Sequence, residues 1–177
     1  RADPGWEAQP GYLANPAQNP RVEVRDGAVE LSIAEPGKGM KFRLALAPFD
    51  CSAADYLLLR YRASNLGPGY ALWAMSGSGP GREWINTADL KCDGEWHTLA
   101  LDLVGLQESG MLHALLTEVQ CQGPPARIAF ASLVPADEVP AGADVWPPTR
   151  PEEPELVVRA AALPVPKAQP TWLLNPT

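Results

Sequence analysis

The feature that most constrains the fold is a series of short segments in which apolar and polar residues alternate, with turn signals between them. In the first such segment the apolar positions follow a period of two (Val22, Val24, Val29, Leu31 and Ile33). Asp26-Gly27 interrupts this pattern, and Asp-Gly between two alternating runs is a strong signal for a two-residue β-hairpin. The pattern therefore predicts an antiparallel hairpin with one buried face.

The same alternation recurs along the middle of the chain. Further strands are predicted at 40–46, ended by Pro48, and at 56–62, 70–75, 82–87, 95–103 and 127–134. The segment 111–119 fits both a helix and a strand, and we predict a strand from about Leu115. Eight or nine short strands without a long helix predict an all-β protein, a jelly-roll type β-sandwich of antiparallel strands.

The prolines divide the chain of 177 residues into three parts. Residues 1–20 are predicted to form an irregular lead-in held down by Trp6 and Tyr12, and residues 21–146 the sandwich. Ten of the twenty prolines lie between Pro135 and Pro176, so residues 147–177 are predicted to be a Pro-rich arm or linker with a strand-like run at 155–163. Residues 155–174 suit two roles: self-assembly by strand addition to another copy, or a linker or self-packed strand.

Charge and hydropathy exclude several classes of partner. The net charge is −7, and no run of Lys or Arg occurs, which argues against nucleic acid and anionic membrane surfaces. No apolar stretch approaches the roughly 18 to 20 residues of a membrane-spanning helix. The chain opens with Arg1 rather than Met, as expected after removal of a secretion signal or after trimming. We expect a secreted or cell-surface protein, and for an exported chain the lack of an N-glycosylation sequon favours a bacterial source.

Catalytic motifs are missing from the sequence. His97 and His113 are the only histidines, and neither a Gly-x-Ser-x-Gly elbow nor an HExxH motif is present. We therefore predict a protein that is not an enzyme. A glycosidase-like pair of carboxylates, Glu83 with Glu95 or Asp102, remains open because such acids need only be close in space.

The three cysteines leave their own alternatives open. Cys51, Cys92 and Cys121 lie in no CxxC pair and are too few for a disulfide scaffold. Two arrangements fit: one bridge with an odd thiol, which is either free and buried or joins two chains, or thiols that are free and buried.

Three segments resemble the jelly-roll modules of the carbohydrate-binding-module and galactose-binding-like type. They are DYLLLRYRAS (55–64), DGEWHTLALDL (93–103) and LLTEVQCQGPPARIAFASLV (115–134), and the resemblance covers about residues 22–146. It implies a non-catalytic module associated with polysaccharide-active or cell-surface proteins, often with a structural calcium ion. Trp96 matches the strand-opening tryptophan of these modules, which implies a packing role. Glu30 and Asp144 match the acidic calcium ligands of these modules; the alternative is that both are surface acids, since calcium takes six or more oxygen ligands.

The predicted ligand site surrounds the Gly/Ser/Pro-rich loop at 76–81. Sugar binding uses flat aromatic rings together with amide, carboxylate or guanidinium groups. The sequence supplies these groups beside the loop (Tyr70, Trp73, Arg82, Glu83, Trp84 and Asn86). The alternative is that Trp73 and Trp84 face the core. Separately, His97 is predicted to lie against the core, on the same face as the leucines of its strand. We expect a secreted carbohydrate-binding or accessory module with a glycan or polysaccharide as partner; the alternative is a structural subunit of an extracellular assembly.

Overall fold

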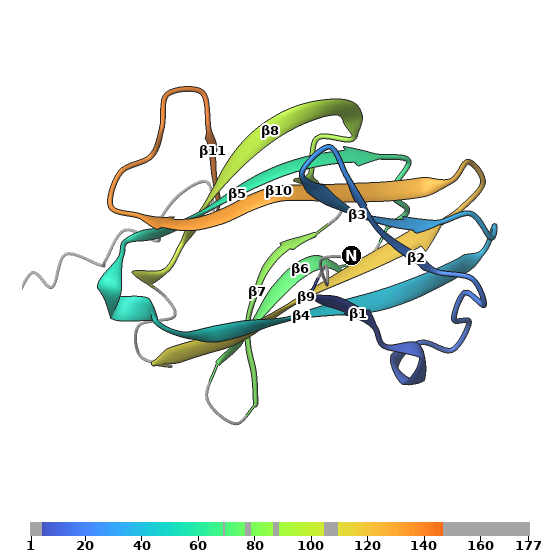
Figure 1. Ribbon diagram of the computed structural model, residues 1–177, viewed down its shortest axis with the longest axis horizontal. Coiled ribbons are helices and arrows are strands. Elements are labelled where there is room, and N and C mark those ends of the chain that lie inside the picture. Colours follow the sequence, from blue (N-terminus) through green and yellow to red (C-terminus); the bar gives the residue numbers. More distant parts are fainter. Residues whose placement is uncertain (1–4, 69, 77–78, 87–88, 105–109, 147–177) are drawn as a thin grey trace, which may run out of the picture.

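Two β-sheets packed face to face make up the domain (Figure 1). This computed structural model describes residues 5–68, 70–76, 79–86, 89–104 and 110–146, with only the backbone for 70–76 and 79–86. Within the described residues there is no α-helix, and therefore no helix that could cross a membrane. The predicted all-β two-sheet sandwich is confirmed.

The strands form one five-stranded and one six-stranded sheet. The order in the five-stranded sheet is β1 (Trp6–Ala8), β4 (Lys38–Asp50), β9 (Met111–Cys121), β6 (Tyr70–Ser76) and β7 (Gly79–Asn86). The order in the six-stranded sheet is β11 (Asp144–Trp146), β8 (Asp93–Asp102), β5 (Tyr56–Ser64), β10 (Ala126–Ala136), β3 (Ala28–Ile33) and β2 (Arg21–Arg25). Two short 3-10 helices, η1 (Pro10–Tyr12) and η2 (Cys51–Ala53), lie between strands.

The first hairpin forms as the sequence predicts. Strands β2 and β3 pair antiparallel, with Val24 opposite Val29 and Arg25 opposite Ala28. Asp26 and Gly27 between them both have positive φ angles, 50° and 77°. Positive φ at both central residues matches the right-handed twist of the flanking strands, which explains why Asp-Gly is favoured there.

Two central strands run longer than predicted. β9 is a strand from Met111 onward, so the helical alternative for residues 111–119 is not formed. β4 continues through Pro48 to Asp50, and its pairing with β9 shifts register between Ala45 and Phe49. Proline lacks the N–H that a sheet ladder needs, so it is tolerated where the ladder is already interrupted.

Two three-residue strands were not predicted. β1 lies in the supposedly irregular lead-in and pairs with β4, while β11 adds to β8 in the one parallel pairing among the described strands. Three residues are too few for a period of two to be recognised. Trp6 in β1 is nonetheless buried, as expected, whereas Tyr12 is 66% exposed and does not hold the lead-in down through burial.

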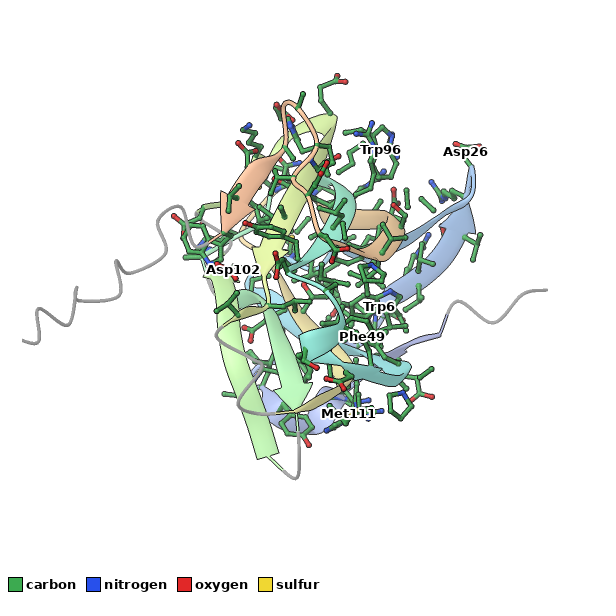
Figure 2. All side chains as sticks on the ribbon, turned by 90° about the vertical axis from the view of Figure 1, so that its left-hand side faces the viewer. Trp6, Asp26, Phe49, Trp96, Asp102 and Met111 are labelled. Carbon is green, nitrogen blue, oxygen red and sulfur yellow. The ribbon has the colours of Figure 1, made fainter. Side chains whose placement is uncertain are left out.

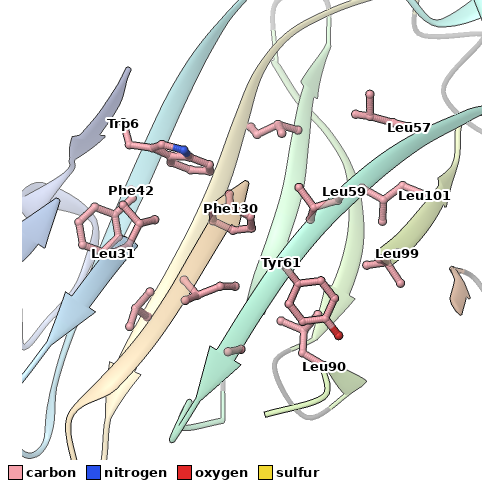
Figure 3. Close-up of a cluster of buried hydrophobic side chains, with 14 of the residues drawn as sticks. Trp6, Leu31, Phe42, Leu57, Leu59, Tyr61, Leu90, Leu99, Leu101 and Phe130 are labelled. Atoms are coloured by element: carbon pink, nitrogen blue, oxygen red, sulfur yellow. The ribbon is translucent and has the colours of Figure 1, made fainter. Parts of the chain in front are cut away.

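The core lies between the two sheets and joins residues far apart in sequence (Figure 3). The ring of Trp6 stacks on that of Phe130, with centroids 5.0 Å apart. Phe42 and Leu31 are completely buried, and Tyr61 nearly so. Each such side chain contributes about 1.5–3 kcal/mol by burial, so this layer fixes which face of each strand points inward.

Strand β8 has the two faces that its sequence predicts. Leu99 and Leu101 are buried in the core, and the His97 ring lies on the same face, 5.7 Å from the Tyr61 ring. Trp96 has the opposite parity and lies on the outer face of the six-stranded sheet. Trp96 therefore packs against the surface residues Arg60 and Arg62 and not against the core.

Candidate functional site

The predicted sugar patch falls on strands β6 and β7. Their backbones pair antiparallel, which places Tyr70 opposite Asn86 and Trp73 opposite Glu83. The six side chains proposed for this patch lie outside the described part of the chain (Tyr70, Trp73, Arg82, Glu83, Trp84 and Asn86). The patch stays a prediction.

Glu30 and Asp144, the proposed calcium ligands, lie on different parts of the six-stranded sheet. Glu30 is on β3 and Asp144 on β11, with β10, β5 and β8 between them. Four strand spacings of about 4.8 Å separate them by roughly 19 Å across the sheet. Asp144 instead forms an ion pair with Lys91 at 2.6 Å. The two carboxylates therefore do not form one site, and no group of three or more His, Cys, Asp or Glu in the described residues is placed to hold a metal ion.

The carboxylates of the alternative glycosidase pair belong to different sheets. Glu83 is on β7 of the five-stranded sheet, and its side chain is outside the described set, whereas Glu95 and Asp102 are on β8 of the six-stranded sheet. Asp102 is buried, and its Oδ1 accepts a hydrogen bond from the Val104 N–H at 2.9 Å. This contact gives Asp102 a role in the turn that follows β8.

The outer face of the six-stranded sheet carries a hollow of about 290 Å³. Its lining comes from β3, β5, β8 and β10 (Glu30, Arg62, Ala63, Ser64, Gly94, Arg127 and Ala129). Figure 2 shows the neighbouring Trp96 at the surface on this side of the sheet, away from Trp6 in the interior. We refer to this feature as the outer hollow.

Strand register explains why the outer hollow forms here. One row of directly opposed residues crosses five strands in the order Glu23, Glu30, Ala129, Arg62 and Trp96. Directly opposed residues share a face and lie about 5 Å apart. Ala129, in the middle of the row, has only a methyl group between the long side chains of Glu30 and Arg62. The alanine leaves a floor, and its longer neighbours become the walls.

Arg62 links the outer hollow to Trp96. Its guanidinium carbon lies 4.9 Å from the centroid of the indole, and that of Arg60 lies 5.9 Å from it. Both distances are within the range of a cation–π interaction. Among the described residues, Arg62 has no hydrogen-bonding or ion-pair partner, whereas Arg60 donates to the Thr98 hydroxyl at 3.2 Å. The indole therefore supports the Arg62 guanidinium without using its N–H donors.

Glu30 forms the opposite wall. Its side chain is only 11% exposed, and its Oε1 lies 4.0 Å from Arg25 and 3.9 Å from Arg127. Hydrogen bonds between nitrogen and oxygen require about 2.7–3.2 Å, so these are charge contacts. The contacts offset the cost of holding a shielded carboxylate, and they leave the guanidinium donors of Arg127 able to bind another group.

This face is basic although the chain as a whole is acidic. Five of the fourteen Lys and Arg residues point outward from the six-stranded sheet (Arg21, Arg25, Arg60, Arg62 and Arg127). On strands β2, β3, β5 and β10 the same face carries two acidic residues, Glu23 and Glu30, and on β8 Asp93 lies directly opposite Ser64 of the lining. Glu23 pairs with Arg25 at 2.5 Å. A local excess of positive charge therefore surrounds the outer hollow.

His97 of β8 is hydrogen-bonded to Asp93 at the start of the same strand. His97 Nε2 and Asp93 Oδ1 lie 2.8 Å apart, and the same oxygen accepts the Glu95 N–H at 2.9 Å. Both hydrogen bonds lower the pKa of Asp93: the one from His97 has the larger effect, and the one from the Glu95 N–H the next largest. Beneath this pair, the Tyr61 hydroxyl accepts the Lys91 N–H at 3.1 Å, and burial raises the pKa of Tyr61. These contacts fasten the start of β8, next to Gly94 of the outer hollow.

All three cysteines are free thiols. Cys51 and Cys121 are buried, and Cys92 is exposed. Of the alternatives left open by the sequence, the structure therefore shows free thiols and no bridge.

Comparison with known proteins gives a partial structural similarity and no family. No family model matches the chain, and neither does any curated protein. Among solved structures, the secreted serine protease VesC from Vibrio cholerae matches with a TM-score of 0.41 and 15% identity. The match covers 75% of this chain and 28% of the protease. The resemblance to carbohydrate-binding modules thus stays a prediction.

Residue alternation could have identified some of the outward-facing residues at the outer hollow. Arg60 and Arg62 alternate with Leu59 and Tyr61, and Trp96 has the parity opposite to Leu99. Outward positions of adjacent strands therefore carried an aromatic ring and two guanidinium groups. The sequence does not give the register, so it could not show that Arg62 and Trp96 are directly opposed.

Proposed function

We propose that this domain is a non-catalytic glycan-binding module, and that its ligand occupies the outer hollow beside Trp96. The observation that supports this most directly is the row in which Glu30, Ala129, Arg62 and Trp96 follow one another across the sheet. The row combines an aromatic ring beside the outer hollow with charged hydrogen-bonding groups and an open floor inside it, all on one rigid face. Sites for small ligands and sugars use such a combination of apolar surface and a few fixed polar groups.

Each part of the row has a role in this proposal. Trp96 supplies apolar surface against the carbon-bearing face of a sugar ring. Arg62 and Arg127 donate hydrogen bonds to oxygens, and Glu30 accepts them from hydroxyl groups. Because these side chains stand on paired strands, their spacing is largely preformed, which reduces the entropy lost on binding. The proposal also includes the predicted extracellular location.

Retention on immobilised polysaccharides tests the proposal. We expect the wild-type chain to be retarded by at least one member of a panel of plant, algal and bacterial polysaccharides in affinity electrophoresis. Trp96→Ala should lose this retardation because the aromatic ring beside the outer hollow is gone. Ala129→Leu should lose it because the added carbons fill the floor of the outer hollow.

Tyr12→Ala is the matched control. It removes an aromatic ring that is exposed, from η1, which lies against β4 of the other sheet. Retention should be unchanged in this variant. Absence of retention on every polysaccharide, or normal retention of both Trp96→Ala and Ala129→Leu, would overturn the proposal. Loss of retention in Trp84→Ala alone would place binding at β6 and β7 instead.

A further inference from the structure

We infer that the outer hollow recognises the carboxylate of an acidic sugar, so that the ligand is a uronic-acid-containing glycan and not a neutral one. This inference rests on the proposed function and specifies the class of glycan. Two observations support it: the net charge of the residues that line the hollow, and the guanidinium N–H groups of Arg62 and Arg127, which are available for hydrogen bonding.

The charge of the lining matches one negative group. The charged residues of the lining are Arg62, Arg127 and Glu30, which together carry one positive charge at neutral pH. A bound carboxylate would neutralise that charge. A neutral sugar would partly desolvate two guanidinium groups without providing a counter-charge, which is unfavourable.

The geometry of the donors also suits a carboxylate. A guanidinium presents its N–H groups in a planar fork that matches the two oxygens of a carboxylate. The fork of Arg62 is supported by the indole of Trp96 at 4.9 Å and has no hydrogen-bonding partner among the described residues. Arg127 is engaged only by the charge contact with Glu30 at 3.9 Å within that same set. Two forks thus flank the floor formed by Ala129.

Glu30 makes the hollow selective. Its carboxylate stands in the lining and would repel a second negative charge bound close to the first. A chain with one carboxylate per sugar and hydroxyl groups between fits this arrangement, because the hydroxyls can donate to Glu30. A densely sulfated chain places several charges near Glu30 and fits less well. Removal of the Glu30 charge should therefore change which anionic glycan is preferred.

Titration calorimetry with four defined glycans tests the inference. The ligands are polygalacturonate, its fully methyl-esterified form, dextran sulfate and neutral dextran. We expect polygalacturonate to bind at least tenfold more tightly than its ester, because the ester keeps the backbone but loses the charge. Binding should weaken as the salt concentration rises.

Variants of single residues locate the effect. Arg62→Gln and Arg127→Gln should each weaken polygalacturonate binding by tenfold or more, because each removes a charge-assisted donor. Arg21→Gln is the matched control: it removes the same charge from the same face, but on β2 and outside the lining, and should weaken binding less than threefold. Glu30→Gln should raise the affinity for dextran sulfate relative to polygalacturonate.

The outcomes separate this inference from the proposed function. Equal binding of polygalacturonate and its ester, lost in Trp96→Ala, would overturn the acidic ligand but keep the glycan-binding module. Equal binding of dextran sulfate and polygalacturonate, or an Arg21→Gln effect as large as that of Arg62→Gln, would reduce the site to general attraction of anions and overturn the inference. Absence of binding to all four glycans would overturn the inference. The proposed function would then be decided by retention on the panel of plant, algal and bacterial polysaccharides.

Discussion

The guanidinium carbon of Arg62 lies 4.9 Å from the centroid of the Trp96 ring, and the two residues are directly opposed on β5 and β8. A guanidinium this close to an indole face is attracted to its negative quadrupole. The contact therefore couples the polar lining of the outer hollow to the aromatic ring beside it. It predicts a measurable interaction energy between the two side chains.

A double-mutant cycle measures that energy. We expect Arg62→Ala and Trp96→Ala, singly and combined, to show a coupling of about 0.5–1 kcal/mol in the free energy of unfolding, measured with urea. Arg21→Ala with Trp96→Ala is the control, because β2 and β8 are separated by β3, β10 and β5. This control pair should be additive within about 0.5 kcal/mol. Additivity in both pairs would show that the indole does not stabilise the position of Arg62.

The stacking of Trp6 on Phe130 predicts a large effect from β1, a strand of only three residues. Trp6→Ala should lower the free energy of unfolding by about 3–5 kcal/mol, because it removes an aromatic ring from between the sheets and leaves a cavity. Urea unfolding followed by circular dichroism measures the change. Tyr12→Ala, a few residues away but exposed, should stay within about 0.5 kcal/mol of the wild-type value. A small effect for Trp6→Ala would mean that β1 detaches without disturbing the core.

Trp6 also shows what the sequence could not supply. Its strand has three residues, so no alternation marks it, and its burial depends on pairing with Leu44, far along the chain. By contrast, the β2–β3 hairpin was predictable because Asp26 and Gly27 act locally. The inward and outward faces of β8 were equally predictable, since they follow from parity alone.

The candidate site depends on long-range register. Ala129 lies opposite Glu30 on one side and Arg62 on the other, although both are more than sixty residues away in sequence. Parity predicts that each residue faces outward, but only the pairing of β10 with β3 and β5 makes them neighbours. The sequence therefore directed attention to residues 70–86, where aromatic and polar residues are close in sequence, and missed a hollow built from distant strands.

The hydrogen bonds of Glu35 predict a dependence of stability on pH. Its carboxylate accepts the N–H groups of Gln18 at 3.0 Å and Asn19 at 2.7 Å, and these bonds lower its pKa below the ordinary value of 4.5. A lowered pKa in the folded state means that the stabilisation is present above the unfolded-state pKa. It is lost as the pH falls through the folded-state value. The link between the lead-in and the β3–β4 turn should therefore weaken in acid.

Glu35→Gln tests this dependence. The variant should be less stable than the wild-type chain at neutral pH, because an amide oxygen is a weaker acceptor than a carboxylate. The difference should shrink as the pH falls below about 4.5, where the wild-type carboxyl also loses its charge. Free energies of unfolding, measured with urea from about pH 7 to about pH 3, give the comparison. A difference that is constant with pH would show that the charge of Glu35 does not contribute.

The free thiols predict an order of chemical reactivity. Cys51 is completely buried, and burial raises the pKa of its thiol; Cys121 is also buried, and its Sγ lies 3.3 Å from the Pro124 carbonyl oxygen. Since the thiolate is the reactive form, burial gives Cys51 less access to reagent and less thiolate than an ordinary exposed thiol has. Cys92 is exposed, although partial burial raises its pKa as well.

We expect one thiol per chain to react with a disulfide reagent in the native state, slowly at neutral pH and faster in mild alkali, and three after unfolding in urea. The Cys92→Ser variant should show no fast native reaction, and rapid modification of that variant would mean that the core opens around Cys51 or Cys121.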